Sequence, residues 1–215
     1  MRRLIALVFS VVSCFGVFAQ QGMGPGPGVK GYSGGAAFNE GFNFRATSGF
    51  VTDGTDDTFV LTSDTYPTTR AGVTFGWETT SGLDSRDRSS GVDARLAGMH
   101  FKANDNTSTI TFRVDLPSTG DYSIRLAIGD ATGGNSQVNY VTAKDNSTAF
   151  ITLSPISTDG DHYGDAAGNL PLEGDWAATN VAVTRTFAST IMRVTLGGTV
   201  DSASSTIAHL KVVKL

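Results

Sequence analysis

Short runs of alternating apolar and polar residues make up most of the chain beyond residue 38. The clearest run covers residues 109–116, in which every second side chain is apolar and the side chains between them are polar. A period of two indicates a strand with one buried face. Residues 121–129 alternate in the same way, and Pro117 and Gly120 between the two runs are typical of a turn. We therefore expect these two strands to form a β-hairpin.

Similar short runs recur along the rest of the chain, separated by Gly, Asn, Asp and Ser. No window carries an apolar stripe of period 3.6 over the length of a helix. Many short strands at turn spacing favour an all-β sandwich or barrel. The other strands are expected near residues 41–47, 57–62, 72–78, 97–102, 137–143, 148–153, 191–196 and 206–214.

The first residues have the pattern of an export signal. Arg2 and Arg3 precede an almost continuous apolar run, and the residues up to Ala19 form an acceptable cleavage site, so residues 1–19 are predicted to be a signal peptide. The residues ending at Cys14 also resemble a bacterial lipobox, which leaves a lipid-anchored form open. A retained membrane anchor and a true start at Met23 are further alternatives, although the apolar run is short for a span of about 20 residues.

The remaining chain divides into two parts by composition. Residues 20–37 are rich in Gly and Pro and lack any apolar period, which predicts a flexible segment. Residues 38–215 carry the strand pattern and are expected to form one β-sandwich domain. The predicted mature protein is therefore secreted or periplasmic, with no transmembrane span, unless Cys14 is lipidated.

Composition and charge narrow the classes of partner that the protein could bind. Hydrophobic residues make up 40% of the chain and charged residues 17%, which is enough apolar content for a packed core. The net charge is −4, and removal of Arg2 and Arg3 with the signal peptide leaves 14 basic against 20 acidic residues, or −6. No basic run is present, so a nucleic-acid partner is disfavoured. The single cysteine excludes a disulfide framework and a cysteine-based zinc site.

The segment of residues 65–100 concentrates charges in a chain that has few of them. Two interpretations are open: a salt-bridged loop that folds over one end of the sandwich, or a polar binding rim beside an aromatic platform. Sugar rings stack on aromatic side chains, while Arg and Asp hydrogen-bond their hydroxyls. The candidate ligand-binding residues are Tyr66, Trp77, Arg86, Asp87, Arg88, Asp93 and Arg95.

A second acidic stretch contains Asp159, Asp161 and Asp165. Clustered carboxylates of this kind bind calcium in many loops, although the spacing fails the EF-hand pattern. A plain solvated loop is the alternative interpretation. We therefore predict no required cofactor and name these three residues as candidate ligands of a structural calcium ion.

The search for catalytic motifs is negative. The sequence contains no Gly-x-Ser-x-Gly elbow, no His-Glu-x-x-His and no phosphate-binding glycine loop. Its three histidines are scattered. We therefore expect a protein without catalytic activity, while paired-carboxylate catalysis stays an open alternative.

Several short motifs occur in a fixed order along the chain. They are Thr65-Tyr66, Phe75-Gly76-Trp77, Ser85-Arg86-Asp87-Arg88, Asp115-Leu116-Pro117, Tyr122-Ser123-Ile124-Arg125-Leu126, Gly129-Asp130-Ala131 and Leu196-Gly197-Gly198. Their order resembles galactose-binding-like jelly-roll domains, over about residues 38–215. It is especially similar to carbohydrate-binding modules and to the accessory β-domain of rhamnogalacturonan acetylesterase-type enzymes. That resemblance implies an antiparallel jelly-roll β-sandwich; the Gly-Asp-Ser motif of the esterase module is absent.

Two functions follow from these observations. The first is an exported, non-catalytic carbohydrate-binding module whose partner is a polysaccharide or glycan. The second is a structural or adhesive β-sandwich of a cell surface or virion, without affinity for sugars. Fold alone does not decide between them, because the same sandwich serves many functions. An exposed Tyr66 or Trp77 would favour the first function.

Overall fold

The computed structural model describes residues 37–47, 57–88, 93–103, 108–130, 137–158, 163–171, 179–198 and 204–215, and it is all-β. The described strands are numbered in the order in which they occur along the chain. They are β1 (Asn39–Phe44), β2 (Thr58–Val60), β3 (Thr68–Arg70), β4 (Val73–Thr79), β5 (Leu83–Asp87), β6 (Gly98–Lys102), β7 (Thr109–Asp115), β8 (Gly120–Ile128), β9 (Gln137–Asp145), β10 (Thr148–Thr158), β11 (Gly164–Asp165), β12 (Val183–Phe187), β13 (Ile191–Gly197), β14 (Ser205–Ile207) and β15 (His209–Lys214).

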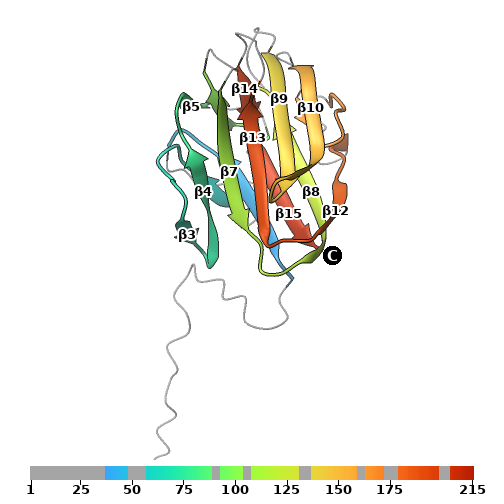
Figure 1. Cartoon of the computed structure of the whole chain (residues 1–215). Coiled ribbons are helices and arrows are strands. Elements are labelled where there is room, and N and C mark those ends of the chain that lie inside the picture. The colour runs from blue at the N-terminus through green and yellow to red at the C-terminus, as the bar shows by residue number, and fades with distance from the viewer. Residues whose placement is uncertain are drawn as a thin grey trace, which may run out of the picture.

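Two six-stranded sheets pack face to face, as Figure 1 shows. The front sheet has the strand order β10-β9-β13-β7-β4-β3. The back sheet has the order β11-β8-β15-β1-β2, with β12 also paired to β8. A small third sheet, β14-β6-β5, lies at one end. All these pairings are antiparallel except that of β1 with β2. The predicted antiparallel β-sandwich of the jelly-roll type is confirmed.

The core lies between the two large sheets and is built by the period-two pattern. On β7 the side chains of Ile110, Phe112 and Val114 are buried, while the residues between them are more exposed. Inward side chains of β13, the neighbouring strand, are buried beside them, and those of β8 and β15 come from the facing sheet. Removing these side chains from water stabilises the fold by about 25 cal/mol per Å² of apolar surface.

The strongly alternating runs were located correctly, and several short polar strands were missed. β3, β5, β11 and β12 have no counterpart among the predicted strands. The segment predicted as one strand over residues 206–214 divides into β14 and β15, which belong to different sheets. β5 has the sequence LDSRD, whose single apolar residue gives no alternating pattern. Its pairing with β6 provides the strand, and local sequence does not reveal such a partner.

The predicted hairpin of residues 109–116 and 121–129 is wrong. β7 pairs with β4 and β13 in the front sheet, whereas β8 pairs with β15, β12 and β11 in the back sheet. The turn between them therefore crosses from one sheet to the other. Both arrangements satisfy a period-two pattern, because each strand needs only one face buried against apolar side chains. The hydroxyl of Tyr122 donates a hydrogen bond to the carbonyl of Ser118 and stabilises this crossing.

The predicted signal peptide and nearly all of the Gly/Pro-rich segment lie outside the described residues, as does Cys14. Within the described part of the chain, no helix is long and apolar enough to cross a membrane.

Candidate functional site

Trp77 lies in the core, so its prediction as a sugar-binding platform is wrong. Its side chain is 1% exposed and packs against the rings of Phe44, His100 and Phe112. The alternation along β4 points this indole inward together with Phe75. A buried ring offers no face to a ligand, and Trp77 is therefore an element of the fold.

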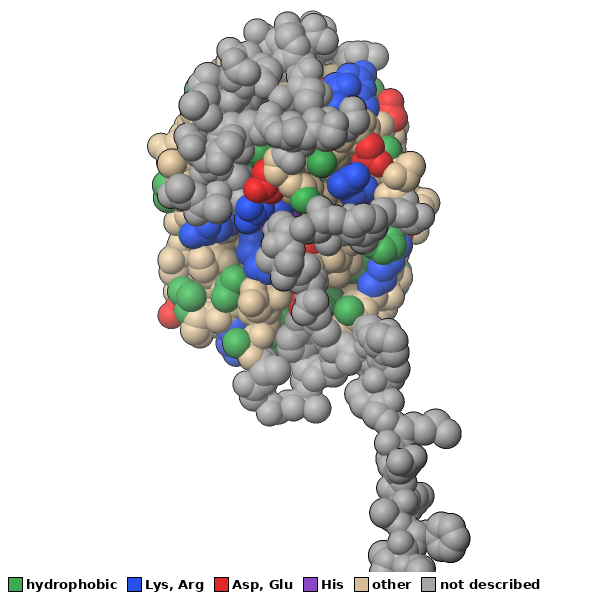
Figure 2. Space-filling model, turned by 180° about the vertical axis from the view of Figure 1, so that it is seen from behind, with side chains coloured by type: hydrophobic (Ala, Val, Ile, Leu, Met, Phe, Trp, Pro, Cys, Tyr) green, Lys and Arg blue, Asp and Glu red, His purple; other side chains and the backbone are tan. Residues whose placement is uncertain are grey.

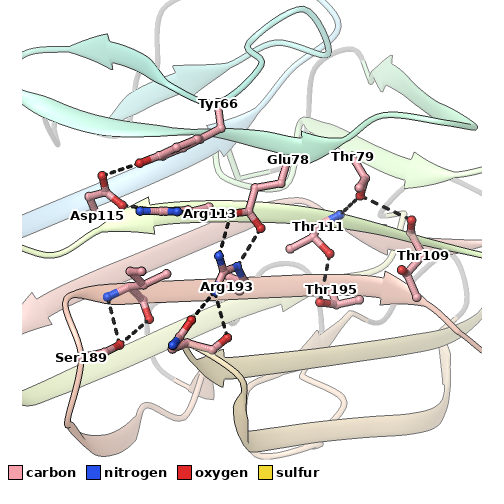
Figure 3. Close-up of polar contacts among 12 residues, drawn as sticks. Tyr66, Glu78, Thr79, Thr109, Thr111, Arg113, Asp115, Ser189, Arg193 and Thr195 are labelled. Atoms are coloured by element: carbon pink, nitrogen blue, oxygen red, sulfur yellow. Dashed lines mark hydrogen bonds and ion pairs between the residues drawn. The ribbon is translucent and has the colours of Figure 1, made fainter.

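Tyr66 lies on the outer face of the front sheet. A Cβ at Gly76 would lie 2.6 Å from the backbone nitrogen of Tyr66, so the absence of a side chain at Gly76 lets the chain pass over β4 there. The backbone nitrogen of Tyr66 donates a hydrogen bond to the carbonyl of Trp77 at 3.0 Å. The Tyr66 hydroxyl donates to Asp115 at 2.8 Å, and the guanidinium of Arg113 lies 4.1 Å from the centre of its ring (Figure 3).

The other predicted ligand residues are held in local contacts that favour the salt-bridged interpretation. The Arg86 guanidinium lies over the ring of Phe101 at 4.9 Å. Arg88 forms an ion pair with Asp130, and Arg95 forms one with Asp93 at 2.6 Å.

Asp87 joins β5 to the end of β1. One of its carboxylate oxygens accepts from Nε of Arg45 at 2.9 Å and from the backbone nitrogen of Ala46 at 2.8 Å. The other accepts from the hydroxyl and backbone nitrogen of Thr47. Burial opposes its ionisation, but these hydrogen bonds and the charge of Arg45 outweigh burial and lower the pKa of Asp87. The Asp87 carboxylate therefore stabilises the fold by connecting these two segments.

The predicted residues do not form one site. The carbonyl of Ala94 accepts a hydrogen bond from the side chain of Asn43 on β1, so the loop around Asp93 and Arg95 lies against the back sheet. Figure 2 views the molecule from the back, where basic and acidic side chains lie next to one another. Tyr66, by contrast, contacts β4 and β7 of the front sheet.

Of the three predicted calcium ligands, Asp159 and Asp161 lie outside the described residues. The Asp165 side chain is buried, and it accepts hydrogen bonds from the backbone nitrogens of Ala167, Asn169 and Val181 and from the Asn169 amide, at 2.8–2.9 Å. This carboxylate organises the loop that follows β11. In the part of the chain that the structure describes, no group of three His, Cys, Asp or Glu side chains could hold a metal ion.

A β-bulge on β4 places two successive polar residues on the outer face of the front sheet. Trp77 is paired with Phe112 and Thr79 with Thr111, so that Glu78 is the extra residue between them. An extra residue changes the side to which the following side chains point. Glu78 and Thr79 are both exposed and both lie on the outer face, as Figure 3 shows.

Glu78 is the centre of an ion-pair network across β4, β7 and β13. Nε and Nη2 of Arg193 donate to its two carboxylate oxygens at 2.7 and 2.8 Å, and Arg113 approaches it at 3.4 Å. Nε of Arg113 also donates to Asp115 at 2.8 Å, and Arg193 donates to the side-chain oxygen of Asn146 at 2.5 Å. The hydrogen bond from Arg193 is the main cause that lowers the pKa of Glu78, and the same contact raises the pKa of Arg193. Glu78 and Arg193 are therefore ionised and held in place before any ligand arrives.

Beside this network, a row of threonines crosses the sheet in register. Thr111 is paired with Thr79 on one side and with Thr195 on the other, Thr195 is paired with Thr142, and Thr142 is paired with Thr152. The five residues lie on five adjacent strands, β4, β7, β13, β9 and β10. Thr79 and Thr152 are exposed, and Thr195, which shares a hydrogen bond of 3.3 Å with Thr111, is 6% exposed.

This polar face combines features suited to a ligand rich in hydroxyl groups. Threonine offers a hydroxyl that donates and accepts and a methyl group that packs on apolar surface, while Arg and Glu supply a fixed donor and a fixed acceptor. This face was not predicted from the sequence, because the period-two pattern was interpreted only for its buried side chains. The polar residues of β7, Thr109, Thr111, Arg113 and Asp115, were visible in the same alternation.

Comparison with known proteins supports the fold. The structure is similar to protein YxiM from Bacillus subtilis, with a TM-score of 0.52 and 20% sequence identity. The match covers 83% of this chain, but only 40% of that protein. This likeness shows the β-sandwich fold that the family resemblance implied.

Weaker structural matches include two family 35 carbohydrate-binding modules. The module from Clostridium thermocellum is 11% identical, with a TM-score of 0.38, and the match covers 62% of this chain and 89% of that one. The module from an environmental isolate is 16% identical, with a TM-score of 0.34, and the match covers 61% and 85%. No family model and no curated protein matches the sequence.

Proposed function

We propose that this protein is an exported, non-catalytic carbohydrate-binding module, and that the outer face of the front sheet binds the glycan. The observation that carries the proposal is the polar face itself: the threonine row and, beside it, the network of Glu78, Arg113 and Arg193. Side chains fixed by one another lose little freedom on binding, which favours recognition by hydrogen bonds. Export rests on the predicted signal peptide of residues 1–19.

Affinity electrophoresis through gels that contain single soluble polysaccharides tests this proposal. The folded protein should be retarded by at least one polysaccharide in a panel of neutral and acidic polymers. Replacing Arg113 with alanine should weaken the retardation about tenfold, because it removes the group that lies on Tyr66 and bonds Asp115. Arg125→Ala, on β8 of the opposite sheet, is the matched control and should bind as the wild type does.

Two outcomes would contradict the proposal. The first is a folded protein that no polysaccharide in the panel retards. The second is equal loss of binding in Arg113→Ala and Arg125→Ala, which would move the site away from the front sheet. If the protein does not bind and light scattering shows stable oligomers, the structural or adhesive function takes its place. Turnover of any polysaccharide by the protein would contradict the non-catalytic part.

A further inference from the structure

From the outer face of the front sheet we infer the class of glycan that it takes: a single, extended, uncharged chain that lies across the strands and follows the threonine row. This inference rests on the proposed carbohydrate-binding function and adds the direction, the length and the charge of the ligand. Three properties of the face carry it, namely the spacing of the row, the twist of the sheet and the pairing of its charges.

The spacing of the row favours a polymer. Neighbouring strands are about 4.8 Å apart, so the five threonines from Thr79 to Thr152 extend over about 19 Å. One strand spacing is close to the length of one sugar unit in an extended β-1,4-linked chain. A chain laid across the strands therefore brings one sugar unit to each strand, and accessible threonine hydroxyls meet it on β4, β7, β9 and β10. Thr195, which is almost buried, acts as a positioning residue through its hydrogen bond to Thr111.

The twist of the sheet favours a single soluble chain over a crystalline surface. Adjacent strands in a sheet rotate by about 20–25° relative to one another. Each threonine is consequently turned relative to the preceding one. A glycan chain follows this rotation by small changes at each glycosidic linkage, whereas a rigid flat lattice touches only two or three strands at once.

The charges of the face favour a neutral ligand. The two guanidinium groups of Arg113 and Arg193 are matched by the carboxylates of Glu78 and Asp115. Their donors already point at these carboxylates, so an anionic polymer gains little from them and meets two negative charges. Lys144, in register with Arg193 on β9, is the one further charge in this row of the face. The face is therefore nearly balanced, and binding should depend little on salt.

Calorimetric titration with neutral β-1,4-linked oligosaccharides of one to six units tests the length and the direction. The glucose, mannose and xylose series are the probes. In the series that binds, affinity should increase with each added unit up to five and then level off. Thr152→Val, at the exposed end of the row, should weaken binding of the five-unit chain about three- to tenfold and leave the three-unit chain unchanged, because a short chain occupies the other strands. Thr184→Val, on β12 of the back sheet, is the control and should change neither.

The preference for an uncharged ligand is tested with two polymers that share the same backbone, hydroxyethylcellulose and carboxymethylcellulose, at low and high NaCl. The neutral polymer should bind more tightly, with an affinity that salt hardly changes. Preference for the anionic polymer, lost in high salt, would overturn the inference and leave the proposed function intact. A single sugar that binds as tightly as the five-unit chain would do the same. Failure of every glycan to bind would instead contradict the proposed function.

Discussion

Glu78 and Arg193 are 115 residues apart in the chain and form a two-point ion pair on the outer face of the front sheet. Nε and Nη2 of the guanidinium reach the two oxygens of one carboxylate, so the pair fixes orientation as well as distance. Glu78 follows the buried Trp77 and points outward by ordinary alternation, and the bulge at Glu78 turns Thr79 to the same face. The ion pair and the first threonine of the row therefore lie next to one another on the candidate site.

Double-mutant cycles will measure what this ion pair contributes. Glu78→Gln and Arg193→Gln should each lower the free energy of unfolding, with a coupling energy of about 1 kcal/mol or less, because both side chains are partly exposed. The pKa of Glu78 is lowered, so the stabilisation is complete above the ordinary value of 4.5 and is lost as the pH falls through the lowered value. Urea denaturation between pH 2 and 7 would show it. A coupling that is unchanged at pH 2 would contradict an ionic contact.

The fold was largely predictable because the buried side chains recur every second residue, as on β7 and β13. The pairing of strands was not, since β7 and β8 bury the same kind of face whether they form a hairpin or lie in opposite sheets. The charged loop was recognised as unusual, but sequence does not show that Arg88 meets Asp130, which is 42 residues away. The polar face depends on the register between strands that are distant in the sequence, and this register cannot be predicted from one sequence.

The buried position of Trp77 can be tested by fluorescence. Replacing Trp176 with phenylalanine leaves Trp77 as the only tryptophan of the chain. Its emission should be that of an apolar environment, acrylamide should quench it weakly, and addition of a bound glycan should leave it unchanged, because the indole is 1% exposed. Strong quenching that a glycan prevents would show that the ring is exposed at the binding site after all.

The role of Asp165 can be tested by replacing its carboxylate with an amide. Asp165→Asn should lower the free energy of unfolding by about 2–3 kcal/mol, because the new NH₂ group faces backbone N–H donors where a carboxylate accepted their hydrogen bonds. Asp84→Asn, an exposed substitution on β5, should change stability by less than about 0.5 kcal/mol. Both effects should be the same in calcium and in chelator. A loss that appears only in calcium would show that Asp165 serves as a metal ligand.

Gly76 can be tested against a second glycine of similar backbone conformation. Gly76 and Gly120 have φ values of 144° and 127°, so alanine is strained at both, at a cost of about 1–3 kcal/mol. Only at Gly76 would the Cβ also meet backbone atoms of residues 64–66; at Gly120 the nearest atom is Cε of Lys214, at 3.9 Å. Gly76→Ala should therefore destabilise the protein more than Gly120→Ala in urea denaturation, and it alone should weaken glycan binding, because it displaces Tyr66. Equal effects of the two variants would contradict this role of Gly76.

His100 should make the protein less stable as the pH falls. Its ring is buried against Phe44 and Trp77, and burial lowers its pKa from 6.5 to about 4. The unfolded chain then takes up a proton at a higher pH than the folded one, so stability is lost as the pH falls from about 6.5 to about 4, by up to about 3 kcal/mol. Urea denaturation at a series of pH values should show this slope in the wild type, and His100→Gln should lack it within that range. If the variant and the wild type lost stability in parallel between pH 6.5 and 4, the imidazole would not be the group that titrates.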